Sequence, residues 1–411
     1  MNNRISVDKV LIQGCSIEYK FCLEGDWKKA FNSESMRIEY SIDVSSVPES
    51  IAVIPLLANI LPIAWVYDAK IAVRECDKSF YDSIADFKKG YKDMYPMLEL
   101  KGEIEVGTLV DNKATGDGTV AFFSGGVDAF NTLVKHATEK PTLVTLWGAD
   151  VKLSDAEGWK NVETHILNTA EEFGIDFVSV KSEFRDFIKM WTLTAAVEKS
   201  GDDWWHGFQH GIGIICHAAP IAYVLGKSTV YFASSFTAAD KGKVKCASDP
   251  TIDNFVRFCG ARVVHDGYEY DRQAKIHNIV EYAKESGRKI ALRVCWEATG
   301  GSNCCKCEKC WRTLLGVYAE GENPNNYGFD YESFPDLCKL IYKKRELLAW
   351  HRDSRYAPIQ KRMRELYTAE TVEPNLKWFY NINLDSLELR YFRKTLGKRI
   401  VNKIKWVLKK N

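Results

Sequence analysis

Four cysteines near residue 300 have the spacing of a metal site. They form the pattern C-x8-C-x2-C-x2-C and are Cys295, Cys304, Cys307 and Cys310. Two C-x2-C steps that share Cys307 bring three sulfurs together, and Cys295 can complete a tetrahedron, so the set is typical of structural Zn²⁺. An iron–sulfur cluster is the alternative for four thiolates. Cys305, inside the same run, is either a bystander or an exchangeable ligand.

A glycine pair in the stretch FFSGGVDA, residues 122–129, directly follows an apolar run. A strand-to-helix turn of this kind offers backbone N–H groups and the positive end of a helix dipole to an anion. Gly125 and Gly126 let the backbone adopt positive φ and approach a phosphate closely, and Ser124 can donate its hydroxyl. Asp128 repels bare phosphate, so we expect it to act through Mg²⁺ or to cap the following helix. Taken alone, a plain glycine turn explains the pattern equally well.

The elements around this loop predict an α/β fold with a parallel sheet covered by helices. From Thr119 onward, apolar runs alternate with helical stretches such as 155–173 and 210–226. Such alternation implies a parallel sheet, whose ligands bind beyond the carboxyl ends of the strands. The expected strands lie at 119–123, 142–148, 176–180 and 228–235. The glycine loop, WGAD (147–150) and ASSF (233–236) all fall at strand ends.

The length of 411 residues predicts two or three domains. Residues 1–115 mix period-two runs, at 37–44 and 98–106, with a helical run at 81–91, which predicts an N-terminal α+β accessory domain. A polar linker at 110–118 then leads to a central domain, 116–320, and a helical C-terminal extension, 321–411. The apolar run 51–67 is short and interrupted by prolines, so we expect buried core and no membrane span.

The glycine loop resembles the S-G-G-x-D-S loop of the PP-loop ATP pyrophosphatase superfamily, with Ala129 in place of the usual serine or threonine. A PP-loop domain followed by C-x8-C-x2-C-x2-C is similar to the 7-cyano-7-deazaguanine synthase family of the queuosine pathway, over about residues 119–320. The resemblance implies Zn²⁺ at the four cysteines and ATP at the loop. The implied nucleotide-binding residues are Ser124, Gly125, Gly126, Val127 and Asp128. That family's tyrosine-proline-aspartate-cysteine-arginine stretch is not evident between the motifs, so the substrate need not be the deazaguanine acid.

Enzymes of this superfamily use ATP and Mg²⁺ to adenylate a carbonyl or carboxylate oxygen, and a nucleophile then displaces AMP. The resemblance therefore implies an ATP-dependent ligase that acts on a small molecule, a 7-deazaguanine-like compound among the candidates, and forms a C–N bond or a nitrile. Ser124 and Asp128 would be its catalytic residues. Two alternatives stay open: a sulfur-transfer enzyme acting on tRNA through Cys305 or Cys246, and a catalytically degenerate nucleotide-binding partner protein, which Ala129 suggests.

Other polar side chains have a structural interpretation beside a functional one. His206, His210 and His217 share a helical stretch with no acidic partner at a suitable spacing, so we expect them to pack. We expect core packing for the neighbouring tryptophans as well. Four further residues beyond expected strands are candidate substrate contacts or surface charges: Asp240, Lys241, Asp249 and Asp253. Lys309 and Arg312, beside the cysteines, could hold substrate or phosphate.

The charge pattern bears on the partners. Lys and Arg total 56 against 55 Asp and Glu, so the whole chain has no nucleic-acid footprint. The segment 392–411, however, holds eight Lys or Arg and no acid, with apolar residues at helical spacing. We expect it to pack on the protein, with RNA or an anionic membrane surface as the other partners. The first ten residues lack a signal-peptide layout, which predicts a cytoplasmic protein with reduced thiols. The oligomeric state stays open, a homo-oligomer included.

Overall fold

The computed structural model describes residues 3–295, 297, 302–345, 348 and 355–386. The basic segment 392–411 lies outside these residues. The chain divides into two compact units. The first comprises Met1–Ser124 and Asp128–Glu269, and the second comprises Gly125–Val127 and Tyr270–Asn411.

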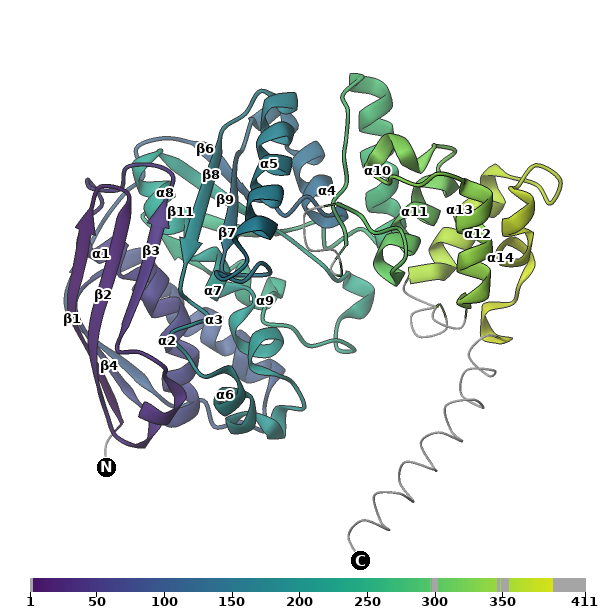
Figure 1. The fold of residues 1–411 in the computed structure, drawn as a ribbon. Coiled ribbons are helices and arrows are strands. Elements are labelled where there is room, and N and C mark those ends of the chain that lie inside the picture. Colours follow the sequence, from purple (N-terminus) through teal and green to yellow (C-terminus); the bar gives the residue numbers. More distant parts are fainter. Residues whose placement is uncertain (1–2, 296, 298–301, 346–347, 349–354, 387–411) are drawn as a thin grey trace, which may run out of the picture. The chain divides into compact units, whose positions relative to one another are not determined.

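The first unit is built on an 11-stranded sheet with the order β10-β11-β9-β6-β7-β8-β3-β2-β1-β4-β5 (Figure 1). The strands are β1 (Arg4–Gln13), β2 (Ser16–Glu24), β3 (Ser35–Tyr40), β4 (Lys70–Asp77), β5 (Glu103–Val110), β6 (Gly118–Phe122), β7 (Thr142–Trp147), β8 (Phe177–Ser182), β9 (Lys227–Ala233), β10 (Arg257–Phe258) and β11 (Ala261–Asp266). The run β11-β9-β6-β7-β8 is parallel throughout, and β3 joins it by pairing antiparallel with β8. Strands β5 and β6, on either side of the predicted linker at 110–118, belong to this one sheet, so the segment joins two of its strands.

The burial of the strands follows from their place in the sheet. All but the first residue of β6 are buried, as expected for a central parallel strand with helices on both faces. In β2 buried and exposed residues mostly alternate, as expected for a strand with one solvated face. The predicted α/β fold with a mostly parallel, helix-covered sheet is thus confirmed.

The helices of this unit are α1 (Glu49–Ala52), α2 (Ile54–Tyr67), α3 (Lys78–Met94), α4 (Val127–Lys135), α5 (Ala156–Phe173), α6 (Met190–Ala196), α7 (Ile212–Ile215), α8 (Ala218–Val224) and α9 (Pro250–Asp253). The first two pack against β4, while α5 packs on β8 (Figure 1). The apolar run 51–67 forms the end of α1 and all of α2, and it is buried over most of its length, as predicted. Within the described part of the chain, no helix has the length and apolar character needed to cross a membrane.

The single helical stretch predicted at 210–226 is wrong, because the chain breaks there. A π-helical turn, η4 (Trp205–Gln209), is followed by the separate helices α7 and α8. Gly211, which lies between η4 and α7, has φ of +110°, and a Cβ at this position would lie 2.5 Å from the carbonyl oxygen of Ala247. A residue with positive φ interrupts a right-handed helix, and the close approach of Ala247 requires glycine.

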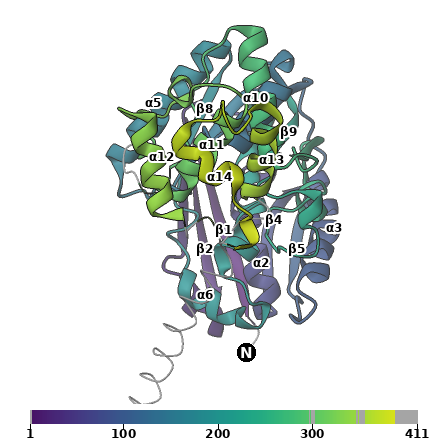
Figure 2. The ribbon, with the colours of Figure 1, turned by 90° about the vertical axis from the view of Figure 1, so that its right-hand side faces the viewer.

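The second unit is mainly helical in its described part. Its helices are α10 (Arg272–Ser286), α11 (Glu308–Ala319), α12 (Phe334–Lys343), α13 (Ala357–Leu366) and α14 (Lys377–Asn381). Helix α11 packs against α10 and α13, and α13 packs against α14 (Figure 2). The described residues just before Cys295 form no strand, because Leu292 and Arg293 donate their N–H groups to two separate carbonyls, of Tyr327 and Gly125, and not to one partner strand.

Candidate functional site

The glycine loop joins β6 to α4, as the sequence predicted. Gly125 has φ of +77°, the left-handed conformation that glycine adopts without strain. Helix α4 begins at Val127, so Asp128 is its second residue and not its N-cap. In the first turn of a helix a carboxylate is favoured by the helix dipole. Ala129 is buried in the same turn.

Strand β6 lies where the order of the parallel strands reverses. The chain runs from β6 to β7 and β8 on one side and then returns to β9 on the other side of β6. In open α/β sheets, ligands bind beyond the carboxyl ends of the strands at such a switch point. The register pairs Ala121 with Tyr231, so Ser124 after β6 and Ser234 after β9 leave the sheet at the same edge. The predicted strand ends at 147–150 and 233–236 are therefore confirmed.

The four predicted cysteine ligands come together in the second unit. Their sulfurs all lie within 4.8 Å of one another. The Sγ atoms of Cys295 and Cys307 are 3.9 Å apart, and those of Cys304 and Cys310 are 4.0 Å apart. A tetrahedral ion with bonds of about 2.3 Å to sulfur needs ligands about 3.8 Å apart, so the group can hold one zinc ion. These separations are about twice a disulfide bond length of about 2 Å.

Backbone N–H groups hold the sulfurs of this four-cysteine group in place. Cys307 is the N-cap of α11, where its Sγ accepts a hydrogen bond from the N–H of Cys310 at 3.4 Å. The Sγ of Cys304 accepts one from the N–H of Lys306, also at 3.4 Å. Such bonds orient ligands around a metal, as outer contacts do in metal sites generally.

Asn303 supports the four-cysteine group and was missed from the sequence. Its buried side-chain oxygen accepts the N–H of Cys295 at 3.2 Å, and its Nδ2 donates to the carbonyl oxygens of Leu292 and Gly328 at 2.7 and 2.8 Å. Asn303 thereby ties the segment of Cys295 to that of Cys304. Its position next to Cys304 is the one signal that the sequence contained.

Cys305 lies outside the four-cysteine group. Its thiol donates to the carbonyl oxygen of Asp330 at 3.4 Å, which favours the bystander interpretation over an exchangeable ligand. Arg312 is buried on α11 with its Nε 4.0 Å from Glu308, and Lys309 is half-buried on the same helix. The contact to Glu308 gives Arg312 a structural role.

The expectation that the three histidines pack without an acidic partner is wrong for His206. Its Nδ1 lies 3.0 Å from Asp202, four residues earlier, where the π-helical turn brings the two side chains together. His210 is 3.8 Å from the sulfur of Cys246. His217 is a packed histidine as predicted: it lies 2.8 Å from the Ser182 hydroxyl, and burial lowers its pKa to about 4.

The two tryptophans before His206 differ in their surroundings. Trp204 is fully buried and stacks on Phe208, as predicted for a core residue. Trp205 lies under the guanidinium of Arg185, 4.1 Å from the ring centroid. Arg185 also donates to the carbonyl oxygen of Ala149 at 2.6 Å, just beyond the end of β7. Arg185 could not be identified from the sequence, because its partners are distant in the chain.

The candidate carboxylates after β9 mostly have local roles. Asp249 caps α9 by accepting the N–H of Thr251 at 2.8 Å, and Asp240 accepts the N–H of Thr237 at 2.9 Å. Asp253, by contrast, is fully buried, with its carboxylate 2.8 Å from Nδ1 of His265. These contacts favour structural roles over substrate binding for all three carboxylates.

The buried contact between Asp253 and His265 predicts a stability difference between two neighbouring carboxylates. Asp253→Ala leaves the imidazole of His265 and the hydroxyl of Ser248 buried without their shared partner and should lower the free energy of unfolding by about 2–5 kcal/mol. Asp249→Ala removes a helix cap, which costs about 0.5–2 kcal/mol. Urea denaturation at pH 7 compares the two variants with the wild type. Equal losses in both would contradict a structural role for the buried contact of Asp253.

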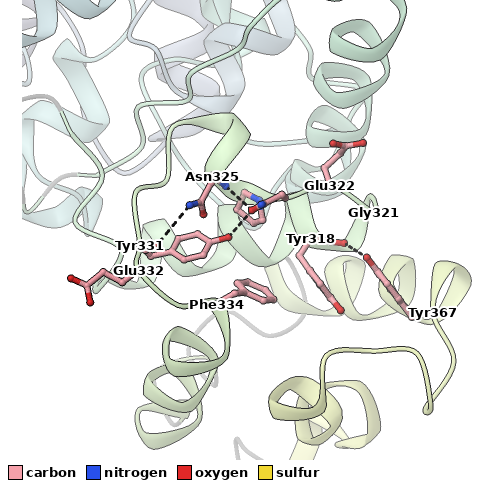
Figure 3. Close-up of a pocket in the computed structure, with 10 residues that line it drawn as sticks. Tyr318, Gly321, Glu322, Asn325, Tyr331, Glu332, Phe334 and Tyr367 are labelled. Carbon is pink, nitrogen blue, oxygen red and sulfur yellow. Dashed lines mark hydrogen bonds between the residues drawn. The ribbon is translucent and has the colours of Figure 1, made fainter.

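A pocket of about 450 Å³ in the second unit contains none of the residues singled out from the sequence. Its walls are aromatic (Figure 3), with Tyr318 stacked on Tyr367 at 4.9 Å and tilted against Phe334 at 5.0 Å. Tyr331 also lines it, and its hydroxyl donates to Asn323. Aromatic faces of this kind suit a flat ring or a cation.

Compared with known proteins, the chain matches no family model and has no significant match among curated protein sequences.

Proposed function

We propose that the chain is an ATP-dependent enzyme that adenylates a small-molecule carboxylate and releases pyrophosphate. The observation that supports this best is the position of the S-G-G-x-D loop. It follows β6, at the switch point of the parallel sheet, where anions bind to exposed backbone N–H groups and the helix N-terminus. We also propose that the four-cysteine group holds Zn²⁺ as a structural ion, because its four sulfurs leave no position open for a reactant.

In this proposal a carboxylate oxygen attacks the α-phosphorus of ATP, the bond to the β-phosphate oxygen breaks, and pyrophosphate leaves. An acyl adenylate remains, and a nitrogen nucleophile then displaces AMP. The backbone at Gly125 and Gly126 would receive the β- and γ-phosphates, with the Ser124 hydroxyl as a further donor. Mg²⁺, bound through an oxygen of Asp128, would neutralise charge that develops on the phosphates.

Exchange of labelled pyrophosphate into ATP tests this proposal, because adenylation is reversible. The full-length protein is incubated with ATP, Mg²⁺ and fractions of a small-molecule extract. We expect label to enter ATP only with fractions that contain the carboxylate substrate, and AMP to accumulate once an amine is added. Release of ADP and phosphate, or no exchange with any fraction, would refute adenylation.

A further inference from the structure

Three side chains that the glycine loop does not use meet in the first unit: Asp202, His206 and Cys246. Asp202 lies 3.0 Å from Nδ1 of His206, and the segment of Cys246 is held beside His206 by the N–H of Ala247, which donates to the carbonyl oxygen of His206 at 2.8 Å. His210 approaches the same sulfur to 3.8 Å. A thiol beside an imidazole that a carboxylate orients is the arrangement of an activated nucleophile. We call these four residues the thiol cluster.

The backbone holds the two halves of the thiol cluster together. The histidines belong to the π-helical turn η4 and its end, and π-helical turns occur often at functional sites. The N–H of Ala247, next to Cys246, donates to the carbonyl oxygen of His206 at 2.8 Å. Gly211 permits this approach, since any Cβ there would meet Ala247.

The charges within the thiol cluster favour the thiolate. Burial acts to raise the pKa of Cys246, but hydrogen bonds from His206 and His210 outweigh it and lower the pKa to about 7. The hydrogen bond to Asp202, followed by that to Cys246, raises the pKa of His206 to about 10. Between these two values Cys246 is a thiolate and His206 an imidazolium.

The other titratable groups that face the cluster do not reverse this balance. Burial raises the pKa values of Tyr91 and Tyr95, so both phenols stay neutral, and Tyr95 donates to Asp202 at 2.8 Å. Asp253 is paired with His265. Lys245 lies over the ring of Tyr95, with its Nζ 5.3 Å from the centroid. Asp150 favours the thiolate indirectly, because its charge raises the pKa of His210.

The thiol cluster is reachable and lies at the ligand-binding edge of the sheet. The side chain of His206 is 38% exposed, while Cys246 is 5% exposed behind it. The rings of His206 and His210 pack near Phe236 and Phe232, at 6.2 and 6.1 Å between centroids. Phe232 belongs to β9, the strand that pairs with β6, and Phe236 follows its carboxyl end.

We propose that Cys246 is a catalytic nucleophile that takes the acyl group from the adenylate, with His206 holding the thiol proton and Asp202 positioning His206. This step rests on the proposed function. The Sγ–carbon bond forms, the bond between the acyl carbon and the AMP oxygen breaks, and AMP leaves as its anion. The product is a thioester at Cys246, and an amine then attacks it to form the C–N bond and return the thiol.

Alkylation by iodoacetamide tests the thiol without ATP. The rate at Cys246 is followed by peptide mass spectrometry as the pH is raised, and its midpoint is expected near pH 7. His206→Gln should move the midpoint up by at least about one pH unit, which slows alkylation at pH 6 by about tenfold. Asp202→Asn should move it in the same direction, a shift that a merely structural role would not produce.

A matched control for these variants is His277→Gln, which removes a half-exposed histidine of the second unit and should leave the midpoint unchanged. Thermal unfolding by circular dichroism verifies that each variant is folded. A midpoint for Cys246 near an ordinary thiol value of about 8.5, or one that His206→Gln does not move, would overturn the proposal.

Acyl transfer is tested with p-nitrophenyl acetate, in which Sγ attacks the ester carbon and p-nitrophenolate leaves. We expect a burst of p-nitrophenolate and an acetyl group on Cys246, both lost in Cys246→Ser. Equal acetylation of the other cysteines would contradict the assignment. Because no ATP is present, a missing burst beside intact pyrophosphate exchange refutes only the thiol step. A burst of p-nitrophenolate without exchange of pyrophosphate into ATP refutes adenylation. It therefore also refutes the acyl adenylate proposed as the donor to Cys246.

Discussion

Cys310→Ser is expected to lose the bound zinc and to unfold the second unit. Cys310 is fully buried in the first turn of α11, whose N-cap is Cys307. Structural zinc contributes about 10–16 kcal/mol of apparent binding free energy in small metal domains, whereas whole domains are stable by about 5–15 kcal/mol. The loss of one of four ligands therefore removes an amount of stability comparable to the total. The proposed zinc ion would hold α11 to the segment of Cys295.

Elemental analysis and hydrogen exchange of peptides from 302–345 measure the two effects. The wild type should contain about one zinc per chain, and Cys310→Ser should contain almost none and exchange rapidly in these peptides. Cys305→Ser is the matched control, because it changes a neighbouring buried cysteine whose thiol contacts Asp330 and not the other sulfurs. Zinc retained by Cys310→Ser, or iron found in the wild type, would contradict a structural zinc site.

Asp128→Ala is expected to lower pyrophosphate–ATP exchange by at least about 100-fold, the usual effect of removing one group that stabilises a charged transition state. Asp128 lies in the first turn of α4, directly after the glycine loop. Without its carboxylate, the loop would lose the oxygen proposed to bind Mg²⁺, while the backbone N–H groups would still bind the phosphates. The loss should therefore appear in the rate of exchange more than in the apparent affinity for ATP.

Initial rates at several ATP and Mg²⁺ concentrations separate these two effects. Asp117→Ala is the matched control, because it removes an exposed carboxylate shortly before β6 and should leave exchange unchanged. If Asp128→Ala retains the wild-type rate, the metal role assigned to Asp128 is wrong. A loss of the same size in Asp117→Ala would instead indicate a general effect of negative charge near the loop.

The sequence predicted those parts of the molecule that depend on neighbours in the chain. The apolar run before Ser124 predicted β6, and the helical run after it predicted α4. Both predictions were possible because apolar residues recur at different spacings in strands and in helices. The cysteine spacing predicted the four-cysteine group, since Cys307 and Cys310 lie at the N-cap and in the first turn of α11 and Cys304 lies shortly before them in the chain. Gly211 was the missed local signal: a glycine inside an apolar helical run marked the break between η4 and α7.

Features that depend on distant contacts were not predictable. Cys246 lies forty residues after His206 in the chain. No periodicity in the sequence predicts that two such distant residues lie close together in the fold. Asp202 was four residues from His206 in the sequence, yet a spacing of this kind becomes a contact only once the turn is known to form. The pairing of β3 with β8, likewise, joins segments about 140 residues apart.

That pairing also governs how the chain can be divided and in which order it can assemble. Strands β1 to β3 are synthesised early, but the partner for β3 is complete only when Ser182 has been made. Until then the β3 edge carries unpaired backbone groups, which are a template for other chains. A fragment starting near residue 116 would have the opposite defect, an uncovered edge at β8. The N-terminal strands therefore cover the β8 edge of the parallel strands, and a shortened chain needs a substitute for them to avoid edge-to-edge association.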